Sequence, residues 1–322
     1  MSIRMDKTGI VESSSGVLDF GDAVLRGVGQ VMFQNNAFAG AIFLVGVFLN
    51  SVLFGVAAIV GAVASTTMAY LVGADRAQIR AGLHGFNGTL VAIALAYFLR
   101  SEIVTWVYIV AAAAASTVVT AALSSLLGNR RPVLTAPFIV VALAFVLAAD
   151  RFGALHTTGL LPTAGLPMGT TAVVGIVGTD TLVSGFFKGI GEIFLQDSAL
   201  SGAVLLAGLL VSSRVACAAA AMGSLIGMLV AWRMGATEES IRLGLFGFNP
   251  ALTAIALGGV FLVLDRAAAG YALLAVVVTA VVFASVSAAL LPIGMPALTA
   301  PFVLVTWAFV LAAPSFEKLA VR

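Results

Sequence analysis

The chain has 322 residues, of which 61% are hydrophobic and 9% are charged, and its formal net charge is +2. A soluble domain carries about a quarter charged residues, so this chain has too few charges to cover a surface that faces water. The composition therefore excludes an ordinary soluble protein and predicts an integral membrane protein. The net charge is too small to suggest nucleic acid as a partner, and we expect none.

The chain begins with a polar segment, residues 1–16, that contains Arg4 and Lys7. This segment lacks an apolar core followed by a small-residue cleavage site, so we expect a cytoplasmic tail and not a signal peptide. Residues 17–34 are apolar but are interrupted by glycine and by Gln30. They are too few to cross a bilayer comfortably, so we expect a re-entrant half-helix.

Five apolar runs follow, and with the half-helix they form a first membrane repeat at 17–150. The runs are 37–54, 55–73, 81–99, 103–127 and 133–149. Residues 151–179 are expected to be an extracellular or periplasmic linker. A second half-helix at 180–196 opens a second repeat at 180–313, before a tail at 314–322. Its runs are 199–213, 215–233, 243–263, 269–290 and 296–313.

The two repeats are copies of one another. Arg26-Gly27-Val28-Gly29-Gln30 aligns with Lys188-Gly189-Ile190-Gly191-Glu192 at an offset of 162 residues. The same offset aligns the two Gly-Phe-Asn segments, at 85–87 and 247–249, and an offset of 164 aligns Leu-Thr-Ala-Pro-Phe at 134–138 with 298–302. Matches in one register over so long a stretch indicate a tandem duplication.

Five crossings are an odd number, so the second repeat must enter the bilayer from the opposite side. With both termini cytoplasmic, 11 of the 16 Lys and Arg residues fall on the inside, as the positive-inside rule requires. We therefore predict an all-α polytopic membrane protein, with ten transmembrane helices in two inverted five-helix repeats, each with a re-entrant half-helix. The expected location is the cell inner (plasma) membrane.

The Gly-Phe-Asn and Thr-Ala-Pro segments interrupt apolar runs in both repeats. Glycine and proline weaken helical hydrogen bonding and leave carbonyl groups without partners. Such backbone is tolerated at membrane depth only where it is buried in protein or lines a wet cavity. Rows of carbonyl oxygens suit a ligand rich in N–H groups. The alternative is ordinary kinks that neighbouring helices or Ser and Thr side chains fill.

Gln30 and Glu192 hold the same position on the two half-helices. Inversion would place them at opposite mouths of one pore, where each could accept a hydrogen bond from a solute nitrogen. Gln34 and Gln196, four residues on, are expected on or near the same helical face. Two alternatives stay open: these groups satisfy local backbone, or Glu192 is a proton-relay carboxylate.

Apolar and aromatic residues accompany the polar ones, namely Phe33, Phe86, Leu90, Phe248 and Leu252. Phe86 and Phe248 adjoin the interruptions, and two facing aromatic rings would form a slot for a flat molecule. A hydrated ion would lose its water there without replacement, whereas a planar neutral amide would lose little. The alternative for each Phe is contact with lipid or core.

The sequence contains no motif of a hydrolase, metalloenzyme or nucleotide-binding enzyme. His84 and His156 lie apart, without clustered metal-ligand residues, and the single cysteine, Cys217, is expected to serve in packing. We expect no enzymatic activity, no cofactor and no metal site.

The doubled set of motifs, the half-helix Gly-x-Gly-Gln/Glu, Gly-Phe-Asn and Leu-Thr-Ala-Pro-Phe, resembles the urea transporter family of bacteria and animals over about residues 17–313. The resemblance implies passive, channel-like permeation of urea and a homotrimer in membrane lipid with one pore per protomer. One departure is that Arg131-Pro132 and Met295-Pro296 stand where the family has Leu-Pro. The resemblance implies these pore residues: Gln30, Val31, Phe33, Phe86, Leu90, Thr135, Glu192, Ile193, Leu195, Phe248, Leu252 and Thr299.

Two other functions compete with urea permeation. The same architecture could pass ammonia, a short-chain amide or water. From a different class, the chain could be a membrane assembly or sensor subunit that transports nothing, although the sequence shows no soluble signalling domain.

Overall fold

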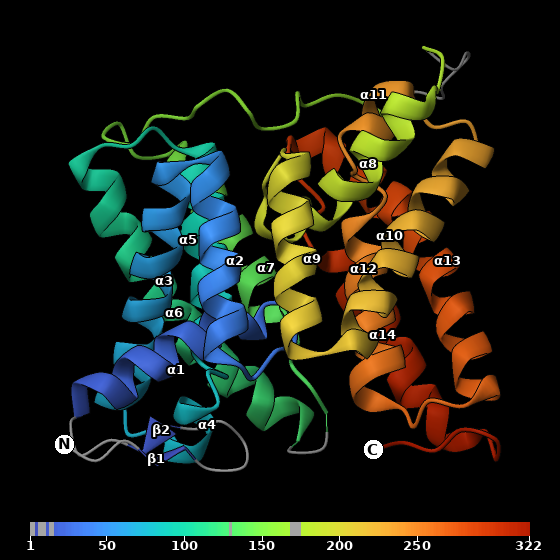
Figure 1. Cartoon of the computed structure of the whole chain (residues 1–322). Coiled ribbons are helices and arrows are strands. Elements are labelled where there is room, and N and C mark those ends of the chain that lie inside the picture. The colour runs from blue at the N-terminus through green and yellow to red at the C-terminus, as the bar shows by residue number, and fades with distance from the viewer. Residues whose placement is uncertain (1–3, 6–10, 13–15, 129–130, 168–174) are drawn as a thin grey trace. The chain divides into compact units, whose positions relative to one another are not determined.

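The computed structural model describes residues 4–5, 11–12, 16–128, 131–167 and 175–322 (Figure 1). Lys7 and Arg130, which entered the charge comparison, lie outside the described residues. The chain forms two compact units, Met1–Leu160 and Leu161–Arg322, which we call unit 1 and unit 2. Each is described separately below.

Unit 1 is helical apart from a short antiparallel pair of strands, β1 (Arg4–Met5) and β2 (Val11–Glu12). Its helices are α1 (Gly16–Gln30), α2 (Ala37–Asn50), α3 (Val52–Leu71), α4 (Arg76–Arg80), α5 (Gly85–Phe98), α6 (Ile103–Leu127) and α7 (Ala136–Ala149). Figure 1 shows α1 steeply inclined to α2, as expected of a half-helix that turns back.

Unit 2 repeats this order of helices. They are α8 (Thr179–Gly191), η1 (Glu192–Phe194), α9 (Ala199–Ser212), α10 (Arg214–Arg233), α11 (Glu238–Arg242), α12 (Phe248–Ile255), η2 (Ala256–Phe261), α13 (Arg266–Leu290), η3 (Leu291–Ile293), α14 (Ala300–Ala312) and η4 (Ala313–Ser315). The pair α3 and α10 has 20 residues each, and the pair α6 and α13 has 25 each. The duplication seen in the sequence is thus a duplication of secondary structure.

The helix boundaries correct two expectations. The first two runs were predicted to meet between residues 54 and 55, but α2 ends at Asn50 because Ser51 caps both helices: its N–H donates to the Val47 carbonyl and its side chain accepts from the Phe54 N–H. The runs 81–99 and 243–263 were expected to contain Gly-Phe-Asn as an interruption inside a membrane crossing. Instead, α5 begins at Gly85 and α12 at Phe248, so each motif starts a helix.

Small residues let these helices approach closely. A Cβ built on Gly61 of α3 would lie 2.2 Å from the carbonyl oxygen of Gly88 in α5. Beside this contact the Ser65 hydroxyl donates to the Gly61 carbonyl at 2.7 Å, and the Thr117 hydroxyl donates to the Ser65 carbonyl at 2.9 Å. Close backbone approach and hydroxyl bonds between helices are the usual means of helix association in lipid.

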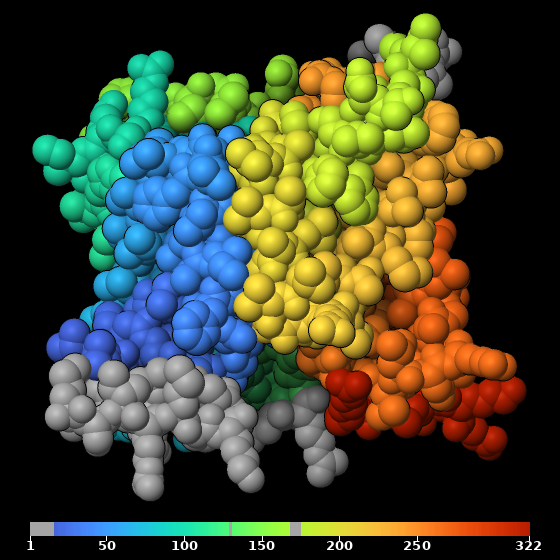
Figure 2. All heavy atoms as spheres, in the orientation of Figure 1, coloured from blue at the N-terminus to red at the C-terminus, as the bar shows by residue number. Residues whose placement is uncertain are grey.

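Within the described residues, four helices, α3, α6, α10 and α13, are long and apolar enough to cross a membrane. The helix over Thr179–Phe194 and α9 form a pair bent by 71°, and shorter apolar helices of 10–17 residues accompany them. Helix α2, whose atoms are blue in Figure 2, carries three large apolar side chains that are each more than half exposed, Phe38, Val45 and Leu49. These features are those of a multi-pass membrane protein.

Candidate functional site

Each half-helix ends in the same tight turn. In unit 1 the N–H of Gln34 donates to the carbonyl of Gly29 at 3.0 Å, and the N–H of Phe33 donates to the carbonyl of Gln30 at 3.0 Å. This pattern is a Schellman motif, whose residue after the helix is left-handed and is usually glycine. Here it is Phe33, with φ of +62°. The turn thus carries the phenylalanine side chain at its bend, and the left-handed conformation costs about 1–2 kcal/mol.

Unit 2 has the same turn, with Leu195 at φ +57° in the place of Phe33. The N–H of Gln196 donates to the carbonyl of Gly191 at 3.1 Å, and the N–H of Leu195 donates to that of Glu192 at 3.0 Å. Two bulky residues in a strained conformation at equivalent positions indicate that the bend, and the side chain on it, serve a purpose beyond chain reversal.

An ion pair or hydrogen bond ties each half-helix to the residue that follows its turn. In unit 1 the buried guanidinium of Arg26 donates from Nη1 to the backbone and side-chain oxygens of Asn35, both at 2.8 Å. In unit 2, Lys188 pairs with Asp197 at 2.5 Å. Arg26 and Lys188, like Asn35 and Asp197, are 162 residues apart. The interaction is therefore present in both copies, as an Arg–Asn hydrogen bond in unit 1 and as a Lys–Asp ion pair in unit 2.

Gln30 and Glu192 lie at the ends of the two half-helices, and each side chain is partly exposed. Nε2 of Gln30 donates to the carbonyl of Ala81 at 2.8 Å, which fixes the amide against the loop before α5. Within the described residues no protein group donates to its Oε1, so this oxygen is available to a solute. Glu192 lies beside the charged pair of Lys188 and Asp197.

The expectation that Gln34 and Gln196 share a helical face with Gln30 and Glu192 is wrong, because the helices end before them. Each amide instead folds back onto its own turn. Nε2 of Gln34 donates to the carbonyl of Met32 at 2.7 Å, and Nε2 of Gln196 donates to that of Phe194 at 2.5 Å. For these two residues, the alternative of satisfying local backbone is confirmed.

The asparagine of each Gly-Phe-Asn motif joins two helix starts. Oδ1 of Asn87 accepts from the N–H of Phe138 at 3.1 Å, and its Nδ2 donates to the carbonyl of Leu134 at 3.4 Å. At least one of the carbonyl groups that were expected to have no partner therefore accepts a hydrogen bond from the protein itself. Sequence reasoning gave Asn87 and Asn249 no role of their own, although their place in a repeated motif would have justified one.

The residue before each of the two threonines is left-handed, with φ of +53° at Leu134 and +47° at Leu298. Thr135 and Thr299 follow at the N-caps of α7 and α14, are 3% exposed, and make no side-chain capping bond. The left-handed leucines thus turn the chain so that the threonines enter the protein interior. Leu134 and Leu298 were missed as sites of strain because sequence gives no sign that leucine adopts positive φ.

Most of the apolar candidates are buried. Phe33, Phe86 and Leu195 are partly exposed, whereas Phe248 is 8% exposed and the others are at or below 2%. In unit 1, α5 packs against α1 and α7, and in unit 2, α12 packs against α8, η1 and α14. The predicted site residues of unit 1 thus lie on α5, or on or next to helices that pack against it, and those of unit 2 lie on α12, or on or next to helices that pack against it. These apolar candidates are Val31, Phe33, Phe86, Leu90, Ile193, Leu195, Phe248 and Leu252.

His84 precedes α5 and is 8% exposed, and neither ring nitrogen has a partner in the described part of the chain. Its counterpart in unit 2 is Phe246, which stacks edge-on against Phe283 at 5.0 Å. His84 therefore occupies an apolar position of the duplicated fold, as an inert packed side chain would.

The sequence matches the urea transporter family over residues 21–314. It is 34% identical over 299 residues to urea transporter 1 of Ovis aries, an alignment that covers 91% of this chain and 77% of the relative. It is similarly 34% identical over 300 residues to urea transporter 1 of Mus musculus, covering 92% and 77%. The family match covers most of the first half-helix, all of the second and both copies of each motif described above, and the chain therefore belongs to the urea transporter family.

Proposed function

We propose that the chain is a channel for passive transport of urea across the membrane. The observation that carries this function is the family match over both repeats, which contain two buried threonines at equivalent helix starts. Membership in a family of transporters also agrees with the expectation that the chain is not an enzyme. The relatives it matches bear the name urea transporter 1.

The proposed architecture has ten transmembrane helices in two inverted repeats, 17–150 and 180–313, with half-helices 17–34 and 180–196 entering from opposite sides. The short helices α2, α5, α7, α9, α12 with η2, and α14 complete the crossings. The α8–α9 bend of 71° supports the re-entrant assignment. Both termini are cytoplasmic in the cell inner (plasma) membrane, residues 151–179 are the extracellular or periplasmic linker, and three protomers, each with one pore, assemble in membrane lipid.

In this mechanism Gln30 and Glu192 stand at the two ends of the pore and accept hydrogen bonds from urea nitrogens. Gln30 is partly exposed, and its amide nitrogen is held by the carbonyl of Ala81, which supports that role. Leu90 and Leu252 with the phenylalanines form walls that exclude hydrated ions, because apolar groups cannot replace an ion's water. The Thr135 and Thr299 hydroxyls provide hydrogen bonds near the pore middle.

Stopped-flow efflux of urea from proteoliposomes tests this function. The expected flux saturates with urea concentration and is the same with or without gradients of sodium ions and protons. Permeability equal to that of protein-free vesicles would contradict the proposal. Parallel measurements with ammonia, acetamide and water determine whether another small neutral solute is the preferred one.

A further inference from the structure

An apolar groove runs along the outer side of α3 in unit 1. It consists of two hollows, of about 500 and 480 Å³, which adjoin one another because Thr67 and Leu71 line both. The first lies between α3 and α6 and begins near Ile59. From Ile59 to Leu71 the helix rises about 18 Å, which is the length of a lipid acyl chain. We call this feature the α3 groove.

The α3 groove ends at two arginines. Arg76 and Arg80 of α4 line the second hollow, together with Tyr70 and Asp19. Arg80 lies 3.8 Å from Asp19, whereas Arg76 is exposed and forms no ion pair within the described residues. The neighbouring carboxylate of Asp75 is engaged by the N–H of Gln78 at the start of α4. Asp75 does not line the second hollow, whose charged lining residues are two arginines and one aspartate, so the lining itself has a net positive charge.

The duplicated helices of unit 2 differ from unit 1 at Arg76 and at two positions that line the α3 groove. At the offset of 162 residues, Glu238 takes the place of Arg76 and pairs with Arg242 at 3.5 Å, and the Thr181 hydroxyl donates to the same carboxylate at 2.7 Å. The positions equivalent to Ala64 and Thr67 are Ile226 and Leu229. At these two positions unit 2 therefore carries larger side chains, and the carboxylate of Glu238 balances the charge of Arg242.

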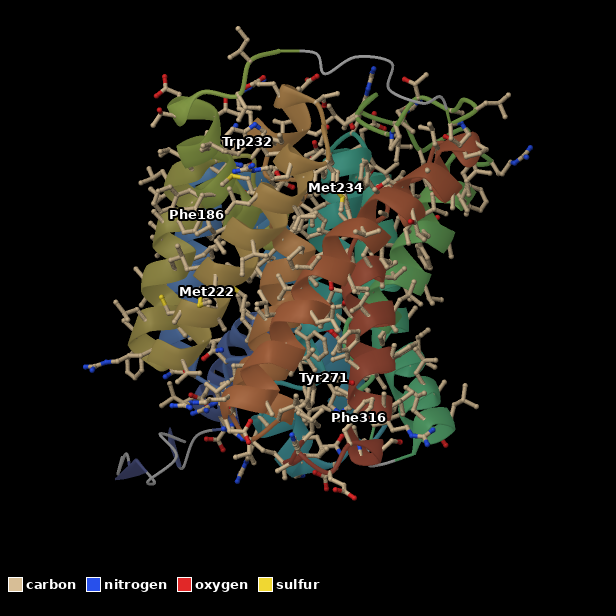
Figure 3. The ribbon with its side chains drawn as sticks, turned by 90° about the vertical axis from the view of Figure 1, so that its right-hand side faces the viewer. Phe186, Met222, Trp232, Met234, Tyr271 and Phe316 are labelled. Atoms are coloured by element: carbon tan, nitrogen blue, oxygen red, sulfur yellow. The ribbon has the colours of Figure 1, made fainter. Side chains whose placement is uncertain are left out.

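Figure 3 shows the side of unit 2 that carries α10, where Met222 and Trp232 are labelled. Both side chains are exposed, Met222 at 59% and Trp232 at 37%. An apolar exterior is thus common to the two copies, whereas Ala64, Thr67 and an arginine at the position of Arg76 belong to unit 1. Packing in the fold does not require this difference, since unit 2 forms the same helices without it.

We propose that the α3 groove binds one anionic glycerophospholipid, with an acyl chain against α3 and α6 and the phosphate at Arg76 and Arg80. An apolar channel that ends in a positive charge is complementary to an amphiphile with a negative head. Guanidinium groups bind phosphate through paired, charge-assisted hydrogen bonds, and anionic lipids attract arginine near a membrane surface. The inference does not depend on which solute the protein transports.

Native mass spectrometry of the purified, delipidated protein tests the proposal by titration with phosphatidylglycerol and with phosphatidylcholine of the same chains. We expect the wild type to bind phosphatidylglycerol with about fivefold higher affinity than phosphatidylcholine, which is the effect of one arginine near an anionic lipid head. Arg76→Gln should abolish that preference and Arg76→Lys should restore part of it. Inorganic phosphate should not displace the lipid, because it lacks the acyl chain.

The matched control is Arg233→Gln, which removes the same charge from the exposed end of α10, where Arg233 lies 5.7 Å from the Trp232 ring. It should bind lipid as the wild type does. If Arg233→Gln and Arg76→Gln lose the preference for phosphatidylglycerol to the same extent, the proposal is overturned, because general surface charge would then explain the preference. Size-exclusion profiles and unfolding temperatures check that each variant is folded.

The double variant Ala64→Ile with Thr67→Leu fills the groove with the residues that unit 2 carries, and it should weaken binding of both lipids. A double variant that is folded, binds lipid normally and loses its oligomeric state would also overturn the proposal, since the groove would then receive a second copy of the chain. If this variant does not fold, the Arg76→Gln and Arg233→Gln pair decides alone.

Discussion

Oδ1 of Asn249 accepts a hydrogen bond from the backbone N–H of Phe302 at 3.0 Å, while its Nδ2 donates to the carbonyl of Leu298 at 3.1 Å. Asn249 is fully buried at the start of α12, and its two partners flank the turn that begins α14. One side chain thereby fixes the first turn of one helix against the first turn of another. Asn87 makes the equivalent bonds to Leu134 and Phe138.

Asn249→Ala should lower the free energy of unfolding by about 1–3 kcal/mol, because it leaves a buried N–H and a buried carbonyl without partners. Thermal unfolding in detergent measures the loss. Thr306→Val is the matched control: Thr306 is fully buried in α14, and its hydroxyl has no partner in the described residues. That variant should be as stable as the wild type or more so. Equal losses in both variants would show that Asn249 does not hold the turn.

Leu134→Gly should be more stable than Leu134→Ala by about 1 kcal/mol, because both remove the buried side chain but only glycine relieves the positive φ. Chemical or thermal unfolding of the two variants gives the difference. Leu95 in the interior of α5 is the control, since it is buried but helical. There the alanine variant should be the more stable by about 1 kcal/mol. The same order at both positions would argue against strain at Leu134.

Gly202→Ala should disrupt the bend between α8 and α9, because a Cβ at Gly202 would lie 1.8 Å from the carbonyl oxygen of Phe187. The backbones must separate to admit it, at a cost of about 1–3 kcal/mol or more. A Cβ at Gly270, in α13, would meet nothing within 4 Å, so Gly270→Ala should be neutral or stabilising. Size-exclusion profiles and unfolding temperatures measure both, and a Gly202→Ala variant as stable as the wild type would contradict the close packing.

Much of the fold was predictable because lipid imposes a simple rule on sequence. The run 103–127 coincides with α6, and the half-helix predicted at 180–196 lies within three residues of the Thr179–Phe194 helix. These boundaries follow from hydropathy and from short polar linkers, which are local properties of the chain. The duplication was equally visible, since its motifs are short and nearly identical.

What sequence did not predict depends on contacts between distant residues. Asn87 and Phe138 are 51 positions apart, and nothing local indicates that the asparagine caps α7. Gln34 was placed on a helical face because the four-residue spacing is helical, but the left-handed Phe33 ends that periodicity. In the same way, leucine at positive φ is so uncommon that no pattern could have indicated it.

Glu192 distinguishes a channel from a proton-coupled transporter. If its carboxylate only accepts a hydrogen bond from urea, Glu192→Gln keeps an accepting oxygen and should retain at least about a third of the flux, whereas Glu192→Ala should lose about two- to tenfold. Urea efflux from proteoliposomes at equal internal and external pH measures both. Abolished flux in Glu192→Gln together with a strong dependence of wild-type flux on a proton gradient would instead favour the relay.

The most direct test of urea permeation through this site compares wild type, Thr135→Val, Thr299→Val and Thr306→Val in one stopped-flow experiment on urea efflux. Loss of one hydroxyl hydrogen bond should raise the barrier by about 0.5–1.5 kcal/mol, so the first two variants should be about two- to tenfold slower than wild type, with Thr306→Val unchanged. Wild-type efflux no faster than that from protein-free vesicles would contradict urea transport itself. Unchanged rates in both Thr135→Val and Thr299→Val would remove the threonines from the pathway.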